Sequence, residues 1–355
     1  EGQFVLEEID AIVRSVGDSF STNAAFIGEL ETDQAKLPEH VRPTKIGESE
    51  EGRPIIGVVA GRGALRISII AGNHADEPVG PEMARALIRH IFRTAGSSRL
   101  LEQCTLAVIL HTNPDGEHRN RLWQSQWPSV RSYLEHVARE EPGRDLEFGF
   151  PDMRQENRVV SRFLDDFGPP DLHLSLHGMA FSEGAMLLIN RHWAAHSGSL
   201  RRHFREAAAE SGLQMHDHNR MGEKGFFYIE PGFWTTPEGS AMRAHFRLIH
   251  EPEMAERFRL SSMEYVERSE NHPLCLVTEL PLFLVSDRRN APAGVPATYL
   301  DFRHNLLEWK ASGRRAEELD DLVARFGLQP LPVATAVRLQ LVALAAAVQL
   351  LVARM

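Results

Sequence analysis

Four side chains of this 355-residue chain have the types and order needed to bind a metal ion and activate water. His74 and Glu77 stand three residues apart, while His177 and Glu279 each follow a distant apolar run. Two imidazoles and one carboxylate suit a catalytic zinc ion, which keeps a further position open for water. We therefore predict one zinc ion per chain, bound by His74, Glu77 and His177. Glu279, on a later strand, is positioned to act on the water.

The first two ligands are predicted to lie in a loop at the end of a strand. They follow the apolar run 65–70, which ends in Ala71-Gly72, and a helix is predicted just after Pro78. The helical His-Glu-x-x-His arrangement of another large class of zinc proteases does not occur in the sequence. Because ligand sites of α/β sheets collect at the carboxyl ends of strands, this position favours a functional site.

Two histidines compete to be the third ligand, His173 and His177. Four residues of extended chain separate them by about 13 Å, so one metal ion can contact one of them. His177 ends an apolar strand and precedes Gly178, whereas His173 lies near the start of that strand. We assign His177 to the metal and expect His173 to be buried and hydrogen-bonded. We interpret the 216–218 segment, His-Asp-His, as surface polarity and not as a second metal site.

The apolar periodicity predicts an α/β fold with helices on both faces of one sheet. Strands are expected at 53–59 and 65–70, as a pair joined by a Gly-rich turn, and at 105–110, 171–176, 186–189 and 274–278. Helices are expected at 4–30, 81–93, 155–167 and 199–211. The 113–116 segment, Asn-Pro-Asp-Gly, is predicted to be a turn, followed by a long loop over 117–150 with a short helix near 130–139. Without a repeat or a linker, residues 1–355 are predicted to form a single catalytic domain.

The overall composition excludes several classes of partner. A formal net charge of -10 argues against nucleic-acid binding, which requires a basic surface. The apolar tail 333–353 is interrupted by Arg338, Gln340 and Gln349, so we expect a core or subunit-contact helix and no membrane span. The sequence leaves the oligomeric state open.

The two cysteines, Cys104 and Cys275, each begin an apolar run and are predicted to be buried thiols. A framework of disulfides is thus excluded, which fits a reducing compartment. No leader-like segment opens the sequence, although its first residue is Glu and not Met. We expect a cytoplasmic protein.

The chain resembles the carboxypeptidase A-like zinc metallocarboxypeptidases over about residues 40–290. The similar segments occur in the family's order; they are 46–55, the His74–Glu77 pair, 113–116, 120–123, 175–178 and 278–280. The resemblance implies zinc held by His74, Glu77 and His177, with Glu279 as general base and acid. It also implies a mixed sheet of about eight strands between helices, with an N-terminal helix and a C-terminal helical extension outside the core. An arginine that polarises the scissile carbonyl is expected after Gly116, and Arg119 and Arg121 are both candidates.

The sequence departs from this family where the family binds the terminal carboxylate of its substrate. In place of the family's Asn-Arg pair stand Glu147 and Phe148, and an arginine between the first two ligands is replaced by Asp76. The chain therefore resembles an atypical, bacterial-type member. Two carboxylates predict a recognition pocket that rejects a free carboxylate and accepts a neutral or cationic group. Alternatively, Glu147 pairs with an arginine in the protein interior and leaves an apolar pocket lined by Phe148 and Phe150.

We predict a zinc-dependent hydrolase that cleaves the amide or peptide bond of a peptide or a small amide. The alternatives are an N-acyl amino acid deacylase or small-molecule amidase of the same fold, and a zinc-binding pseudoenzyme.

Overall fold

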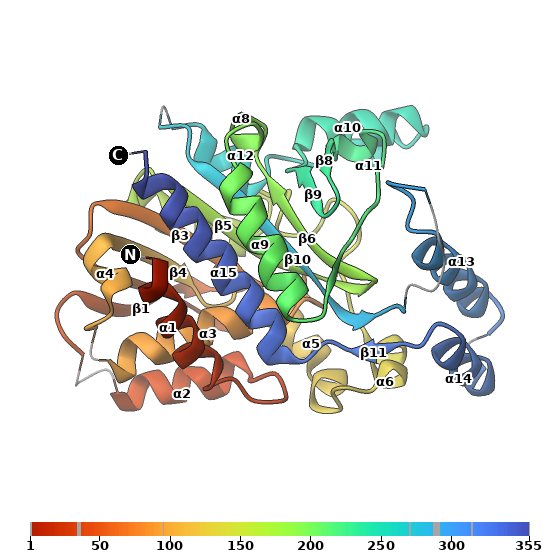
Figure 1. The fold of residues 1–355 in the computed structure, drawn as a ribbon, viewed down its shortest axis with the longest axis horizontal. Helices are drawn as coiled ribbons and strands as arrows, with labels where there is room; N and C mark the ends of the chain where they lie inside the picture. Colours follow the sequence, from red (N-terminus) through yellow and green to blue (C-terminus); the bar gives the residue numbers. More distant parts are fainter. Residues whose placement is uncertain are drawn as a thin grey trace.

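A mixed β-sheet runs through the centre of the molecule (Figure 1). The computed structural model describes residues 2–33, 37–94, 96–269, 271–286, 292–313 and 315–354, with side chains from residue 8 onward, except that of residue 33. Within these residues the strands follow the order β1-β2-β4-β3-β5-β10-β6-β9-β8, and β7 and β11 pair with β6 and β10. They are β1 (Val41–Glu48), β2 (Pro54–Gly61), β3 (Leu65–Ala71), β4 (Cys104–Ile109), β5 (Leu172–Ser182), β6 (Gly184–Ile189), β7 (Gln214–Met215), β8 (Tyr228–Glu230), β9 (Phe233–Thr235), β10 (Leu274–Leu284) and β11 (Gln329–Pro330).

Helices cover both faces of the sheet, as the sequence predicts. They are α1 (Gly2–Val13), α2 (Asn23–Asp33), α3 (Val79–Arg93), α4 (Arg99–Gln103), α5 (Pro114–Ser125), α6 (Val130–His136), α7 (Gln155–Phe167), α8 (Arg191–Ala194), α9 (Gly198–Glu210), the 3-10 turn η2 (Glu223–Gly225), α10 (Gly239–Leu248), α11 (Pro252–Ala255), α12 (Ser262–Glu267), α13 (Ala297–Ala311), α14 (Ala316–Arg325) and α15 (Val333–Val352). Helices α1, α3, α9 and α15 lie side by side on one face (Figure 1). Helices α7 and α12 contact the sheet from the other face.

Alternation along the strands divides the core between these two faces. In β3, Ile67 and Ile69 belong to the larger apolar cluster beneath α3 and α15, whereas Ile70 belongs to the cluster beneath α7 and α12. All three are fully buried. A strand buried on both faces explains the continuous apolar runs of the sequence.

The α/β fold is confirmed, but the sheet is larger than the predicted eight strands, since eleven are described. Six strands are placed from the sequence; the others are β1, of eight residues, and β7, β8, β9 and β11, each two or three residues long. Segments this short carry no measurable apolar alternation, so sequence periodicity does not reveal them.

Two of the predicted local arrangements are wrong. The strands β2 and β3 do not form a hairpin, because β4 lies between them, antiparallel to β2 and parallel to β3. The predicted N-terminal helix over 4–30 is divided into α1 and α2, which are separated by the polar, glycine-containing segment 14–22.

The 113–116 segment begins a helix and does not form an isolated turn. Asn113 caps α5, because its side-chain oxygen accepts a hydrogen bond from the Gly116 amide at 3.0 Å, and Pro114 occupies the first turn. Asp115 is fully buried and accepts a 2.6 Å hydrogen bond from the Ser49 hydroxyl, which fastens α5 to the end of β1. The first part of the predicted loop over 117–150 is thus replaced by α5, whereas the predicted short helix near 130–139 is present as α6.

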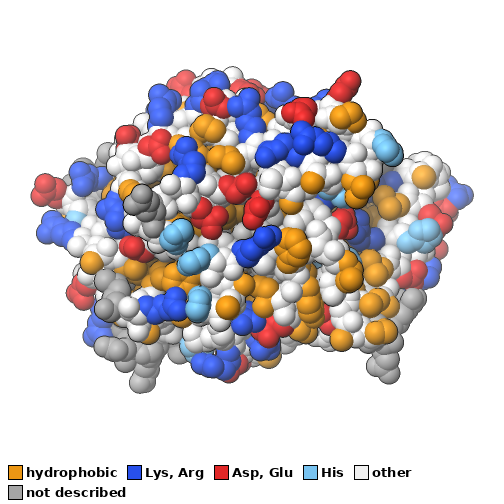
Figure 2. Space-filling view, turned by 90° about the horizontal axis from the view of Figure 1, so that it is seen from above, with side chains coloured by type: hydrophobic (Ala, Val, Ile, Leu, Met, Phe, Trp, Pro, Cys, Tyr) orange, Lys and Arg blue, Asp and Glu red, His pale blue; other side chains and the backbone are white. Residues whose placement is uncertain are grey.

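The apolar tail forms α15, which lies in the core. By length and composition this described helix could cross a membrane, yet 78% of its most apolar window is buried against the rest of the protein. It packs on α9, α1, α3 and the central strands, and the Gln340 amide donates to the Thr278 hydroxyl at 3.0 Å. The expectation of a core helix is confirmed. On the face drawn in Figure 2, charges of both signs are interspersed with apolar side chains, and no continuous basic field is seen.

Candidate metal centre

The turn after β3 brings the first two candidate ligands to the end of the sheet. Gly72 adopts a left-handed backbone with φ of 86°, and a Cβ at this position would overlap the ring of His111. A glycine is therefore required for the chain to turn here. The next residues carry His74 and Glu77 beside the start of α3, as predicted.

The other two predicted residues lie opposite each other on neighbouring strands. His177 in β5 is the register partner of Glu279 in β10, and the strands are parallel. Paired residues of adjacent strands point to the same face of the sheet, so both side chains face one space. Strand β3 stops pairing with β5 at Ala71 and Leu176, one residue before His177. The carboxyl end of β3 therefore meets β5 at the site, although β5 itself continues beyond the predicted end to Ser182.

Three donor atoms converge between these elements. The Nδ1 atom of His74 lies 2.8 Å from a carboxylate oxygen of Glu77, and the Nδ1 atom of His177 lies 2.9 Å from the other. The two Nδ1 atoms are 3.1 Å apart. A tetrahedral zinc ion with bonds of 2.0–2.1 Å to nitrogen places its ligands roughly 3.3 Å apart. The donor set and its spacing therefore fit zinc, and among the described residues this is the group that could hold a metal ion.

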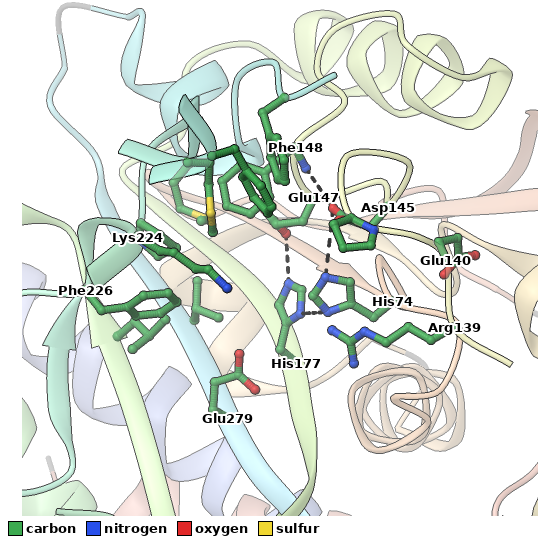
Figure 3. A pocket seen from close by; sticks show the side chains of 18 of the residues that line it. His74, Arg139, Glu140, Asp145, Glu147, Phe148, His177, Lys224, Phe226 and Glu279 are labelled. Carbon is green, nitrogen blue, oxygen red and sulfur yellow. Dashed lines mark hydrogen bonds and ion pairs between the residues drawn. The ribbon is translucent and has the colours of Figure 1, made fainter. Parts of the chain in front are cut away.

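Glu147 fixes the orientation of His177. The Nε2 atom of His177 lies 2.8 Å from Oε2 of Glu147, which also accepts hydrogen bonds from Asn73 at 2.6 Å and Ser175 at 2.9 Å. The amide and hydroxyl of Ser262 donate to its other oxygen at 2.9 and 2.8 Å. A carboxylate that accepts the outer N–H of a histidine leaves the inner nitrogen free to bind a metal. Figure 3 shows this carboxylate above the His177 ring.

His74 also has a carboxylate beside its outer nitrogen, but at a longer distance than the one beside His177. Its Nε2 atom lies 3.9 Å from Oδ1 of Asp145, two residues before Glu147 (Figure 3). Both candidate histidines thus present Nδ1 to the metal position and Nε2 to a carboxylate of the same 145–147 segment.

The carboxylates around the cluster favour a cation there. Burial alone would lower the pKa of His177, but hydrogen bonds to Glu147 and Glu77 raise that pKa well above its usual value. Burial would raise the pKa of Glu147, and the hydrogen bond from His177 lowers it to about 2. A buried position that stabilises positive charge this strongly suits a metal ion as well as a proton.

Glu279 faces the same cluster and differs from the other carboxylates. Burial and the neighbouring charge of Glu77 raise its pKa to about 8, against the opposing effect of His177 and Arg139. Figure 3 shows its carboxylate below His177. A carboxyl group whose pKa lies near neutrality can exchange protons at neutral pH, as a general base must.

The structure adds Arg139, which the sequence patterns did not reveal. Its guanidinium lies 2.9 Å from Glu77 and 3.1 Å from Asp76, at the edge of the site (Figure 3). Asn120 holds it in place, since the Asn120 side chain donates to the carbonyl of Ala75 at 3.0 Å and bonds both backbone groups of Ala138. No periodic pattern or motif marks Arg139.

The predicted arginines Arg119 and Arg121 are not brought to this site. Both lie on exposed positions of α5 and line neither of the cavities around Glu279. The guanidinium of Arg119 pairs with Glu51. The reason is that residues 114–125 form a helix. The buried side of this helix, which includes Asn120, faces the loop of His74 and Glu77, and the two arginines lie on its exposed side.

The prediction for His173 is confirmed, whereas the prediction for the 216–218 segment is partly wrong. His173 is fully buried, and its Nδ1 atom lies 2.8 Å from the Ser68 hydroxyl, which confirms the predicted buried, hydrogen-bonded histidine. The interpretation of 216–218 as surface polarity is wrong for His216. That side chain is buried, and its Nδ1 atom lies 2.9 Å from Oε1 of Glu183.

Both versions of the predicted recognition pocket need correction. Glu147 turns inward, as the second version states, but its partner is His177 and not an arginine. Asp76 is likewise engaged, by Arg139 and by the Tyr133 hydroxyl at 3.3 Å. Phe148 lines the cavity, whereas Phe150 is buried in the core beneath α7. Neither acidic side chain is thus free to repel a substrate carboxylate.

The free cysteines Cys104 and Cys275 are both buried, as predicted. Cys275 lies on β10, on the same face as Glu279 but deeper in the sheet.

Comparisons with known proteins agree with this site. Residues 27–179, which include all three candidate ligands, match the model of the zinc carboxypeptidase family. The fold is similar to that of a metallo-carboxypeptidase from Pseudomonas aeruginosa, solved with (2-guanidinoethylmercapto)succinic acid, with 16% identity, a TM-score of 0.51 and coverage of 93% of this chain and 69% of that one. A metallo-carboxypeptidase from Burkholderia cenocepacia has 14% identity and a TM-score of 0.50, with coverage of 94% and 69%. A comparison with curated proteins finds no match. Residues 27–179 thus match the zinc carboxypeptidase family in agreement with the resemblance, and this match supports a zinc metallohydrolase.

Proposed function

We propose that this zinc metallohydrolase cleaves an amide or peptide bond, with one zinc ion per chain held by His74, Glu77 and His177. The observation that carries the proposal is the convergence of the two Nδ1 atoms and the Glu77 carboxylate, each histidine being oriented by a carboxylate behind it. A zinc ion in such a site supplies Lewis acidity, which polarises a carbonyl group and lowers the pKa of an attacking water to about 7.

We assign the proton transfers to Glu279. As a carboxylate it can take a proton from the attacking water, and the protonated carboxyl can then donate to the leaving amine. Its position opposite His177 puts it beside the metal ligands without making it one of them.

We assign the stabilisation of negative charge on the carbonyl oxygen to Arg139. It lines both cavities that contain Glu279. A well-placed donor of this kind contributes about 3–4 kcal/mol to catalysis. In this proposal Arg139 has the role that the sequence assigned to Arg119 or Arg121.

Substitution of Glu279, compared with substitution of a glutamate outside the site, tests the proposal. We expect Glu279→Gln to retain one zinc per chain and to lose at least about 1,000-fold in kcat, because the amide cannot accept the proton. Glu141→Gln, at an exposed glutamate that pairs with Arg257, is the matched control and should keep normal turnover. Turnover is measured on peptides with free and blocked C-termini and on N-acyl amino acids, and zinc by elemental analysis. A fully active Glu279→Gln enzyme would refute the assignment.

The second candidate function is the hydrolysis of an N-acyl amino acid or another small amide. It is favoured by the engagement of Glu147 with His177, because this residue stands where carboxypeptidases place part of their carboxylate-binding pair. Preference for N-acyl amino acids over peptides in the same panel would select it. We also propose a cytoplasmic location, in keeping with the two free thiols.

A further inference from the structure

Two cavities meet at the proposed general base. One has a volume of about 380 Å³ and the other about 640 Å³, and both are lined by Glu279, Arg139, Arg220, Lys224 and Phe226. The segment that carries Arg220 and η2 therefore covers the boundary between them. A substrate cleaved at this boundary would extend into both cavities.

The register of the strands shows that the cavities follow one another along the sheet. In the β10–β6 pair, Val277 lies opposite Leu188, and both line the smaller cavity. Two residues further along β10, Glu279 lies opposite Met186, which lines the larger cavity. The larger cavity then continues along β5 over Gly178–Phe181. The two cavities are thus on opposite sides of the Glu279 rung.

The smaller cavity ends in an apolar chamber. Phe148, Met242, Phe246 and Phe258 belong to a separate apolar cluster outside the main core. The rings of Phe246 and Phe258 are stacked with centroids 5.0 Å apart, and Phe148 meets Phe258 edge-on at 5.6 Å. A chamber built from three phenylalanines and a methionine favours an aromatic or aliphatic group.

The larger cavity has four cationic side chains against the three carboxylates of Glu77, Glu223 and Glu279, and of the two cavities Arg303 lines this one alone. Arg303 and Tyr299 enter it from α13, which follows the 40–290 core of the family resemblance, and Arg220 and Lys224 enter from the segment around η2. Figure 3 shows the Lys224 ammonium pointing toward His177 and Glu279. These cations make weak internal pairs, since Glu223 lies 3.5 Å from Arg220 and 3.9 Å from Lys224.

Other charges in this cavity are already engaged or favour the same conclusion. Arg303 lies over the ring of Tyr299 at 5.7 Å, and no carboxylate of the described residues is within 4 Å of it. The carboxylate of Glu183 is bound to His216. Burial lowers the pKa of His218 to about 4, and the charges of His216 and Arg220 act in the same direction.

From this asymmetry we infer the substrate class, an inference that rests on the proposed function. The scissile amide joins an apolar group, which enters the phenylalanine chamber, to a carboxylate-bearing group, which is bound by Arg303 with Arg220 and Lys224. Guanidinium groups bind carboxylates through paired hydrogen bonds, so Arg303 determines the preference for the acidic group. It is a specificity residue and does not take part in the chemical step.

Matched dipeptides test this inference. The probes are N-acetyl-Glu-Phe and N-acetyl-Gln-Phe, and the same pairs in reverse order, each with a free C-terminus and as the carboxamide. In one of the two orders we expect the Glu probe to exceed the Gln probe by about tenfold or more in kcat/KM, through KM. Arg303→Gln should reduce this preference to less than about threefold, and Arg303→Lys should retain most of it. Arg162→Gln, on the exposed side of α7 and outside both cavities, is the control and should leave the preference unchanged.

Binding separates failure of this inference from failure of the proposed function. The same probes are titrated by calorimetry into the zinc-loaded Glu279→Gln variant, with and without Arg303→Gln. Tighter binding of a Glu probe that depends on Arg303 supports the inference even if no probe is hydrolysed. Equal affinities for the Glu and Gln probes, or a preference for Glu that survives Arg303→Gln, would overturn the inference, whether or not the enzyme hydrolyses any probe.

Discussion

Strand β5 carries two histidines that share residue type, burial and sheet face but differ in their partners and in the direction of their pKa shift. His177, in the middle of the strand and near the metal position, lies within hydrogen-bond distance of Glu77 and Glu147, and these raise its pKa well above the usual value. His173, four residues earlier, is equally buried but has Ser68 as its partner, and burial lowers its pKa to about 4. Strand geometry puts both side chains on one face. The carboxylates of the neighbouring elements make the surroundings of His177, and not those of His173, favourable for a cation.

This difference teaches how the site depends on its supporting residues. The loop after β3 supplies Glu77, and the 145–147 segment supplies Glu147, which Ser262 of α12 holds in place. Each of these contacts joins residues far apart in the sequence. Near the start of β5, Ser68 of β3 offers a neutral hydroxyl in the corresponding position.

The largest expected effect separates the two histidines by zinc content. His177→Ala should reduce bound zinc from one per chain to less than about 0.1, because it removes one of three protein ligands. His173→Ala should retain stoichiometric zinc, and chelation of the unmodified protein should abolish turnover reversibly. Elemental analysis after dialysis measures the result. Loss of zinc in His173→Ala together with retention in His177→Ala would reverse the comparison and refute the ligand assignment.

A smaller effect is expected from the carboxylates behind the ligands. Glu147→Gln should weaken zinc binding by about 10- to 100-fold, as other outer partners of metal-binding histidines do. Asp145→Asn is the matched variant, and because Asp145 lies 3.9 Å from His74, its effect should be smaller. Competition with a zinc chelator of known affinity measures both. If Asp145→Asn weakened binding more than Glu147→Gln, the importance assigned to the short contact with His177 would be wrong.

The convergence of the candidate ligands could be predicted from the sequence because each follows a strong local signal. His74 and Glu77 follow a continuous apolar strand and a glycine, and His177 and Glu279 lie within two other apolar runs. The fold class and helix α7 could be predicted for the same reason, since apolar periodicity is a property of neighbouring residues.

The remaining features depend on contacts between distant segments. The insertion of β4 between β2 and β3 is decided by pairing across the sheet, which no local pattern encodes. Arg139 lies in an irregular stretch, and its position is set by Asn120 and Glu77. The sequence leaves open whether Glu147 faces the substrate or pairs with an arginine in the interior, because the family resemblance gives its place in the chain, whereas its direction depends on Ser262 and His177.

The smallest expected effect concerns His173 and acid stability. The pKa of His173 is lower in the folded protein, at about 4, than in an unfolded chain, at about 6.5. Between these values the unfolded chain binds the extra proton, so the stabilisation from the neutral imidazole is complete above pH 6.5 and decreases as the pH falls toward 4. From pH 7 to pH 5 this amounts to about 2 kcal/mol. Protonation is costly because the fully buried Nε2 atom has no hydrogen-bond partner among the described residues.

Denaturant unfolding of chelator-treated protein at pH 7 and pH 5 tests this point, since removal of zinc excludes metal release from the measurement. The unmodified protein should lose more stability over this range than His173→Gln, by about the 2 kcal/mol given above, because glutamine does not titrate. His111, whose pKa burial also lowers to about 4, remains in the variant and should keep part of the acid sensitivity. Equal losses in the two proteins would mean that His173 is not held neutral by burial, and the contrast between the two histidines of β5 would then rest on the proposed zinc binding of His177 alone.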